Sequence, residues 1–383
     1  MQNWLLPEFI EDILPPEAAR IEGLRRQILE LFTSWGYQQV TPPMVEYLHS
    51  LLTGAGHDLD LKTFKVVDQL TGQLMGIRAD LSPQVARIDA HLLNALGVTR
   101  LCYAGTVLHT LPDGLMQARE FLQTGAELYG HSGIEADCEI QGLMLDSIRA
   151  TGLTGLHLDL GHVGIFHALM NQTELEDEGQ SCVFDAMRSK DPDALKVHAN
   201  LLSSKVMDSL MALQTLYGGI DVIDQAKRLL PKNAIIERAF RDLEMLIQHA
   251  GNVSIGIDLA DLHGYHYHSG VVFAVYAPGF SQPLARGGRY DRVGEIFGRA
   301  RPATGFSMNL RALVRGLPPA REQSGILAPL ISSDPVLCAL IRELRTKGEV
   351  VIYDLPGHEE TKDELACNRI IKRSERGYKV VPI

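Results

Sequence analysis

The stretch LCYAGTVLHTLPDGLMQAREFLQTGAELYG, residues 101–130, decides how the fold of this chain is interpreted. Its first part, Leu101 to Leu108, is an apolar run. The breakers Pro112 and Gly114 follow, and a second run, with partial alternation of apolar and polar residues, extends from Glu120 to Tyr129. This pattern predicts two strands joined by a loop.

The second predicted strand carries Gln123 and Glu127 on one face, because successive side chains of a strand alternate between its faces. An amide and a carboxylate on an apolar strand require polar partners, either in the protein or in a bound ligand. The loop from Thr110 to Gly114 has no arginine, and its one carboxylate is Asp113. Such a loop offers no guanidinium with which to hold a phosphate group.

The composition describes an ordinary globular protein. The chain has 383 residues, 45% of them hydrophobic and 22% charged, which suits two or three domains with a large core. Its net charge of -11 shows no overall basic footprint of the kind that nucleic-acid binders carry. The acidic, proline-broken N-terminal stretch predicts no signal peptide, and no apolar run is long enough to span a membrane. Five scattered cysteines predict reduced thiols in a cytoplasmic protein.

Periodicity divides the chain into three parts. A helix with one apolar face is predicted from Ile21 to Trp35, and a second helix from Ser82, as its cap, to about Leu96. The pattern is helical almost throughout residues 163–248, and the tail predicts a small α/β unit whose last helix spans Cys367 to Glu375. We expect a core formed by residues 1–162 and 249–322, a helical insertion at 163–248 and a C-terminal unit at 323–383.

Five blocks in order carry a resemblance to the histidyl-tRNA synthetases. They are RADLSPQ (78–84), REFLQTGAELYG (119–130), HGYHYHSGVVF (263–273), GGRYD (287–291) and GFSMNL (305–310). The resemblance implies an α+β fold of the class II aminoacyl-tRNA synthetase type, with a six- or seven-stranded antiparallel sheet flanked by helices. It also implies a dimer formed through the first motif, around Tyr37 to Glu46.

The groups that hold ATP in those synthetases are absent at the matching positions. Their second motif begins aromatic–Arg–any–Glu, where this chain has the residues 108–111, Leu-His-Thr-Leu. Their third motif ends in Glu-Arg, where this chain has Arg311-Ala312, and a shift of one residue turns a helical side chain by about 100°. The arginine of their histidine-specific segment is replaced by His263. The resemblance therefore implies no catalytic residue, no nucleotide cofactor and no activating chemistry.

The amino-acid half of the synthetase site is better preserved. Acceptors for an ammonium group and a polar pair with an aromatic wall for an imidazole stand at the matching positions. The resemblance implies that histidine is bound by Asp80, Ser82, Arg119, Gln123, Glu127, Tyr267 and His268. A site that keeps the amino-acid half and loses the nucleotide half indicates a histidine sensor.

Over its full length the chain resembles the regulatory subunits of ATP phosphoribosyltransferase, a synthetase-like family of histidine biosynthesis. The tail is much shorter than an anticodon-binding domain, and the chain is acidic, so tRNA is not expected as a partner. The resemblance implies a hetero-oligomer with a short catalytic phosphoribosyltransferase, which carries out the first step of the pathway. Histidine would then act as a feedback effector of the complex.

Other interpretations remain open at this level. In one alternative, Asp80 and Ser82 have no role other than capping a helix, and Gln123 and Glu127 are retained from an ancestral fold without binding a ligand. An active amino-acid-activating enzyme is a second functional class, which the missing arginines disfavour.

A metal-dependent hydrolase is a third class. It would use His263, His266 and His268, of which the last two share a strand face, with Asp258 and Asp261 near in the chain. No third ligand is fixed by the spacing, and we expect no metal.

Overall fold

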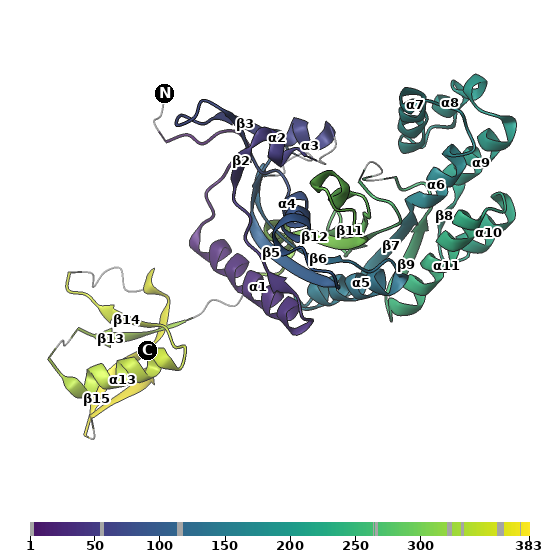
Figure 1. Ribbon diagram of the computed structural model, residues 1–383. Coiled ribbons are helices and arrows are strands. Elements are labelled where there is room, and N and C mark those ends of the chain that lie inside the picture. The colour runs from purple at the N-terminus through teal and green to yellow at the C-terminus, as the bar shows by residue number, and fades with distance from the viewer. Residues whose placement is uncertain are drawn as a thin grey trace. The chain divides into compact units, whose positions relative to one another are not determined.

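The computed structural model describes residues 4–53, 57–112, 118–262, 264, 267–319, 324–330, 333–357, 364–375 and 377–383. The chain forms two compact units, residues 1–317 and residues 318–383 (Figure 1). Among the described residues, no helix combines the length and the apolar character needed to cross a membrane.

The first unit is built on a nine-stranded sheet. In spatial order its strands are β1 (Gln38–Gln39), β5 (Thr99–Leu108), β6 (Glu120–Tyr129), β12 (Ala303–Asn309), β11 (Ala285–Arg289), β10 (Val271–Tyr276), β7 (His157–His162), β9 (Ser254–Asp258) and β8 (Tyr217–Gly218). The six strands from β5 to β7 are antiparallel, as expected. The sheet is wider than expected because β1 adds in parallel to β5, and β9 with β8 extends the other edge.

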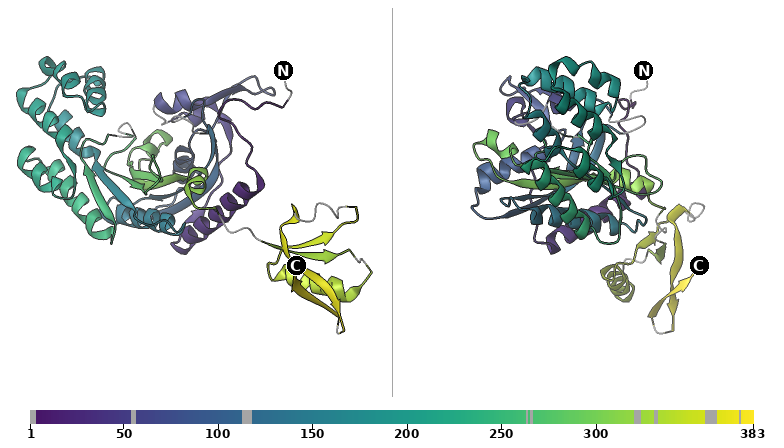
Figure 2. Two further views of the ribbon diagram at one scale, coloured as in Figure 1. Left: turned by 180° about the vertical axis from the view of Figure 1, so that it is seen from behind. Right: turned by 90° about the vertical axis from the view of Figure 1, so that its right-hand side faces the viewer.

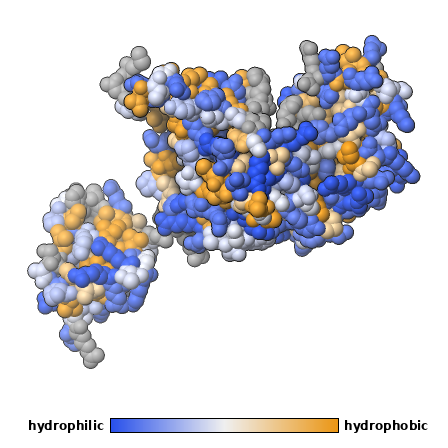
Figure 3. Space-filling model, viewed as in Figure 1, coloured by the Kyte–Doolittle hydropathy of each residue, from blue (hydrophilic) through white to orange (hydrophobic). Residues whose placement is uncertain are grey.

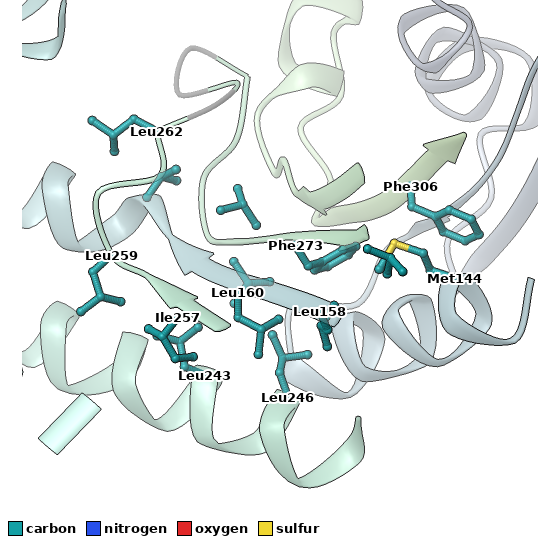
Figure 4. Packing of buried hydrophobic residues seen from close by; sticks show 14 of the residues in the cluster. Met144, Leu158, Leu160, Leu243, Leu246, Ile257, Leu259, Leu262, Phe273 and Phe306 are labelled. Carbon is teal, nitrogen blue, oxygen red and sulfur yellow. The ribbon is translucent and has the colours of Figure 1, made fainter. Parts of the chain in front are cut away.

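Helices cover one face of this sheet. They are α1 (Pro15–Ser34), α5 (Ile134–Arg149), α11 (Ala234–His249) and α12 (Leu310–Gly316), which lie on the same side of it (Figures 1 and 2). Phe32 of α1 meets Phe306 of β12 edge-on, with ring centroids 5.8 Å apart. Figure 4 shows the same layer further along, where Leu158 and Phe273 of the sheet pack toward the helices. The main core therefore lies on the side of these helices, and a smaller core that includes Leu81, Leu101 and Tyr290 lies on the other face.

The segment between β7 and β9 is mostly helical, as the sequence predicts. It contains α6 (Val163–Met170), α7 (Asp177–Arg188), α8 (Pro192–Lys196), α9 (Ser204–Thr215), α10 (Val222–Leu229) and α11. This long connection explains why β7 and β9 can pair in parallel, because parallel neighbours need a crossover. The apolar faces of these helices join the same core as the sheet.

A smaller sheet lies near the first motif. It contains β2 (Val45–Tyr47), β4 (Leu74–Ile77) and β3 (Phe64–Val67), with the short helices α2 (Leu48–Leu51) and α3 (His57–Lys62) beside it in the chain. Strands β3 and β4 form a hairpin whose turn places Gly72 at a φ of 72°, in the left-handed region that glycine tolerates.

The prediction that Ser82 caps a helix is wrong. Helix α4 spans Ser82–Arg87, so Ser82 is its first residue. The preceding residue, Leu81, occupies the N-cap position, and no side chain caps the helix there. The carboxylate of Asp80 accepts a hydrogen bond from the Ser82 backbone N–H at 3.1 Å, while the Ser82 hydroxyl lies 3.0 Å from the Tyr103 hydroxyl. The helix continues as a π-helical turn, Ile88–Leu93, and ends earlier than predicted at Asn94, whose φ of 45° cannot continue it.

The second unit has a four-stranded sheet and one helix. Its strands, in spatial order, are β14 (Val351–Asp354), β13 (Gly325–Pro329), β15 (Cys367–Ser374) and β16 (Gly377–Pro382), with helix α13 (Pro335–Thr346). The helix predicted over Cys367 to Glu375 is therefore wrong. The segment is a strand because it pairs on both sides, and Ile371 packs in the small core with Ile326 and Leu337.

Candidate functional site

The face of the sheet opposite these four helices, on which the short helix α4 packs, carries the polar residues that the sequence singles out. In the β5–β6 hairpin Leu101 faces Glu127 and Gly105 faces Gln123, so both polar side chains point to this side. Glycine on the neighbouring strand gives the carboxylate its room, because a Cβ on Gly305 would lie 1.5 Å from Glu127 Oε2. The space that Gly305 leaves above the sheet, called the recess below, is occupied by the Glu127 carboxylate, with which any larger residue at position 305 would collide.

Glu127 is buried and held by hydroxyl groups. Only 1% of the surface of Glu127 is exposed. The Tyr103 hydroxyl donates to Oε1 at 3.0 Å, and the Tyr290 hydroxyl donates to Oε2. Burial raises the pKa of Glu127 to about 7, although the hydrogen bonds from the hydroxyls oppose that rise. Near neutral pH this carboxyl can therefore exist in both protonation states.

The raised pKa predicts a pH-dependent stability. The folded protein holds the Glu127 proton more tightly than the unfolded chain, whose glutamate has a pKa near 4.5, so the contribution of Glu127 is full below pH 4.5 and is lost as the pH rises through 7. The loss corresponds to about 3 kcal/mol. Urea denaturation of wild type and Glu127→Gln at pH 4.5 and pH 8 checks this, because the wild type should lose about 3 kcal/mol relative to the variant. A difference that does not change with pH contradicts the assignment.

Gln123 is fixed by two hydrogen bonds. Its amide nitrogen donates to Asp80 Oδ1 at 2.8 Å, and its carbonyl oxygen accepts from the Leu81 backbone N–H at 3.0 Å. The second contact sets the orientation of the amide, so the N–H₂ group faces the carboxylate. The Ser82 backbone N–H donates to Asp80, and its hydroxyl lies 3.0 Å from that of Tyr103, which donates to Glu127, so one polar network runs from Gln123 to Glu127.

An aromatic wall stands beside Glu127. The rings of Tyr267 and Tyr290 lie 4.8 Å apart, and those of Tyr267 and His268 lie 5.5 Å apart. Burial lowers the pKa of His268 to about 4, so its imidazole is neutral at physiological pH. Within the described part of the chain, no hydrogen bond of ordinary geometry reaches the buried His268 Nδ1 or the Tyr267 hydroxyl. Buried polar atoms of this kind suit a site that takes a polar ligand.

Arg119, the remaining candidate, makes its contacts elsewhere. Its guanidinium donates to the carbonyl oxygen of His109 at 3.0 Å and lies 4.9 Å from the centre of the Phe64 ring. A longer contact, 3.4 Å, reaches the Glu8 carbonyl oxygen. The structure thus brings six of the seven predicted binding residues into one region, and Arg119 holds the N-terminal segment and the loop end of the hairpin.

Two residues at the matching nucleotide positions are engaged in structural contacts. The His109 ring is buried, lies edge-on to Phe121 and has Nε2 2.9 Å from the Ala79 carbonyl oxygen. Arg311 is also buried and pairs with Glu11 and Glu17 at 3.0 and 3.2 Å. Neither side chain is available to a phosphate in this arrangement.

The metal hypothesis rests partly on residues that the structure does not cover. His263 and His266 lie outside the described residues. Among the residues that are described, no group of three or more histidine, cysteine, aspartate or glutamate side chains is placed to hold a metal ion.

Two tyrosines of the site, Tyr103 and Tyr290, are not among the binding residues predicted from the sequence. Tyr103 lies opposite Gly125 in the hairpin register, so a pairing of the two predicted strands would have placed it on the face of Glu127. Tyr290 reaches Glu127 from across the sheet, at a sequence separation of 163 residues, and only its place in the block GGRYD marked it.

Family models match the chain in two consecutive segments. One, described as histidyl-tRNA synthetase, matches residues 9–313. The other, described as ATP phosphoribosyltransferase subunit HisZ C-terminal domain, matches residues 323–381. Two curated proteins called ATP phosphoribosyltransferase regulatory subunit, from Methylobacillus flagellatus and Ralstonia nicotianae, are each 53% identical, and the alignments cover 100% of this chain and 99% of theirs. The chain belongs to the ATP phosphoribosyltransferase regulatory subunit family.

Solved structures agree with this family. A protein from Bacillus halodurans C, described as an ATP phosphoribosyltransferase regulatory subunit/histidyl-tRNA synthetase, superposes with a TM-score of 0.83 at 27% identity, covering 95% of this chain and 96% of that one. The histidyl-tRNA synthetase from Nostoc sp. PCC 7120, at 17% identity, shares the fold with a TM-score of 0.79 over 100% of this chain and 97% of its own. The expected class II synthetase-like fold and the regulatory-subunit role are thereby confirmed.

Proposed function

We propose that this member of the family binds free histidine in the recess around Glu127 and carries no catalytic activity of its own. It activates a separate, short catalytic ATP phosphoribosyltransferase and transmits inhibition by histidine to it. The observation that supports this most is the division within one hairpin. Gln123 and Glu127 of β6 face a polar recess, whereas His109, at the loop end of β5, is locked to Ala79.

The recess suits an amino acid with an imidazole side chain. Asp80 and Glu127 are acceptors for an ammonium group or a ring N–H, and the fixed Gln123 amide orients the first of them. The rings of Tyr267 and Tyr290 offer an apolar wall to a flat ring. His268 Nδ1, which has no hydrogen-bond partner among the residues that the structure describes, adds a polar group beside Tyr267. A ligand with both a cationic and a ring donor uses all of these groups.

The contacts of two arginines support the proposed absence of activating chemistry. Charge that develops on ATP during activation must be neutralised by fixed cations. Arg311, which stands beside the position of the synthetase arginine, is paired with two carboxylates on the helical side of the sheet. Arg119 is occupied by carbonyl oxygens and by Phe64. We infer a regulatory protein with the five thiols free, as a reducing cytoplasm permits.

Self-association through the first motif completes the proposal. Strand β1 is an edge of the large sheet. Among the residues that follow it, Met44, Val45 and Tyr47 are each about two-fifths exposed. Figure 3 shows hydrophobic atoms gathered over this part of the first unit. Apolar surface of this kind is typical of a contact between subunits. The catalytic partner and histidine are the other expected binding partners, and tRNA is not.

Reconstitution tests the proposed function. The chain alone should show no turnover, and its addition to a short catalytic ATP phosphoribosyltransferase should raise the rate of phosphoribosyl transfer at least about tenfold, which is a coupling of ordinary size for an allosteric complex. Histidine should then inhibit the complex. Because coupling is reciprocal, the substrates of the partner should also change the affinity of the complex for histidine.

Two outcomes would contradict this proposal. One is a mixture that neither co-purifies nor shows stimulation at micromolar concentrations of both chains. The other is histidine-dependent exchange of pyrophosphate into ATP by the chain alone, which would indicate an amino-acid-activating enzyme.

A further inference from the structure

The segment that carries Tyr267 and His268 begins at the end of strand β9. Asp258 is the last residue of that strand, and nine positions further along the chain Tyr267 joins the aromatic wall of the recess. Asp258 shapes the start of the segment, because its Oδ1 accepts a hydrogen bond from the Ala260 backbone N–H at 3.1 Å. The next residue, Leu259, donates its backbone N–H to the Leu216 carbonyl oxygen at 3.1 Å.

A lysine from the helical insertion holds the other oxygen of Asp258. Lys190 follows the end of helix α7, with a φ of 50° and its backbone N–H bonded to the Met187 carbonyl oxygen. This left-handed turn directs the chain back toward the sheet edge. Lys190 Nζ lies 2.5 Å from Asp258 Oδ2 and 5.3 Å from the centre of the Tyr217 ring on β8. One side chain thus links the end of α7 to strand β9 and to the edge strand β8.

The space around this contact is open. A hollow between the end of α7 and the sheet is lined by Lys190 and Asp258, together with Asp159, Asp261 and Tyr276. On this side the segment after β9 faces polar side chains and the hollow. The ion pair between Lys190 and Asp258 lies at the wall of this hollow. Leu259, Ala260 and Leu262 pack in the main core, so the hollow borders the polar side of this segment, where Asp258 and Asp261 lie.

We infer that Lys190 is a positioning residue for the histidine recess. By holding Asp258, it fixes the start of the segment that brings Tyr267 and His268 against Glu127, and it thereby links the helical insertion to the occupancy of the recess. This inference rests on the proposed function, since it concerns the same site. A ligand that orders the segment also stabilises the contact of the insertion with the sheet edge, because linkage is reciprocal.

A double-mutant cycle in the full-length protein tests the inference. Lys190→Met keeps the aliphatic stem beside Tyr217 and removes the charge, and Asp258→Asn keeps the acceptor for the Ala260 N–H. Each single variant should raise the calorimetric Kd for histidine about three- to fivefold, a modest effect because the pair is partly exposed. The double variant should bind no more weakly than either single variant, since both remove the same interaction.

Lys196→Met is the matched control. Lys196 pairs with Asp193 within helix α8, at 2.8 Å, and should leave the Kd unchanged. Hydrogen exchange adds a readout that does not need the ligand, because the amides of residues 259–262 and of Tyr267 and His268 should exchange faster in Lys190→Met than in wild type. Unchanged exchange and unchanged affinity in both single variants, or fully additive effects in the double variant, overturn the inference. A wild-type protein that binds no histidine overturns the proposed function instead, and the exchange rates still decide whether Lys190 restrains the segment.

Discussion

Replacing Glu127 with Gln should weaken histidine binding by about 10- to 100-fold, since a hydrogen bond to a charged partner contributes about 1.5–3 kcal/mol. Glutamine has nearly the same shape, and its amide can still engage the hydroxyls of Tyr103 and Tyr290, so the recess should stay intact. What is lost is the negative charge at the one buried carboxylate between those two tyrosines. Histidine inhibition of the reconstituted complex should fall in parallel, while activation of the catalytic subunit stays largely unchanged.

The control for this experiment is Glu135→Gln. Glu135 is an exposed carboxylate near the start of α5, whose partner is His131 at 3.1 Å, and it should not affect binding. Equal inhibition of wild type and Glu127→Gln by histidine would place the effector elsewhere in the complex. Loss of activation together with loss of inhibition would show that the variant disturbs the fold instead of the ligand contact.

Replacing Arg289 with Met should lower the free energy of unfolding of the first unit by about 3–5 kcal/mol. Arg289 donates to Asp137 Oδ2 at 2.9 and 2.6 Å and to the carbonyl oxygens of His131 and Gly133. Asp137 is fully buried, so the substitution leaves an uncompensated carboxylate in the core. Both tryptophans, Trp4 and Trp35, belong to this unit, and their fluorescence during urea denaturation reports its unfolding.

The pH dependence identifies the cause of that loss. Burial already raises the pKa of Asp137, and Arg289 opposes the rise, so removing the arginine raises this pKa further. The penalty of the variant should therefore be small in acid, where Asp137 is protonated, and should grow as the pH increases. Arg26→Met, which breaks an exposed pair with Glu22, should leave the free energy of unfolding nearly unchanged. A comparable loss in both variants would refute the role of burial.

Much of the fold could be predicted from local patterns. Strands β5 and β6 coincide with the two runs in residues 101–130, and α1 matches the apolar spacing that begins at Ile21. The failures occur where tertiary contacts outweigh local preference. The segment from Cys367 to Ser374 has adjacent isoleucines among charged residues, which suits a helix locally, but it lies between β13 and β16 and pairs with both.

The candidate site could be predicted only in part, for a related reason. Gln123 and Glu127 were visible because they interrupt an apolar strand. The partners of Glu127 were not, since Tyr103 and Tyr290 are apolar in pattern and reach it only through strand pairing. The change in the role of Ser82, from predicted cap to partner of Tyr103, has the same origin. Spacing along the chain does not reveal which hydroxyl a buried carboxylate will find across a sheet.

We propose that the amino-acid half of a synthetase site persists in this chain without its nucleotide half. A calorimetric titration of histidine into the isolated wild-type chain, with and without magnesium and ATP, tests it most directly. We predict saturable binding at one site per chain, with the same Kd and heat in both conditions and no continuing heat of turnover. The absence of histidine binding, or binding whose heat depends on ATP, would contradict the claim.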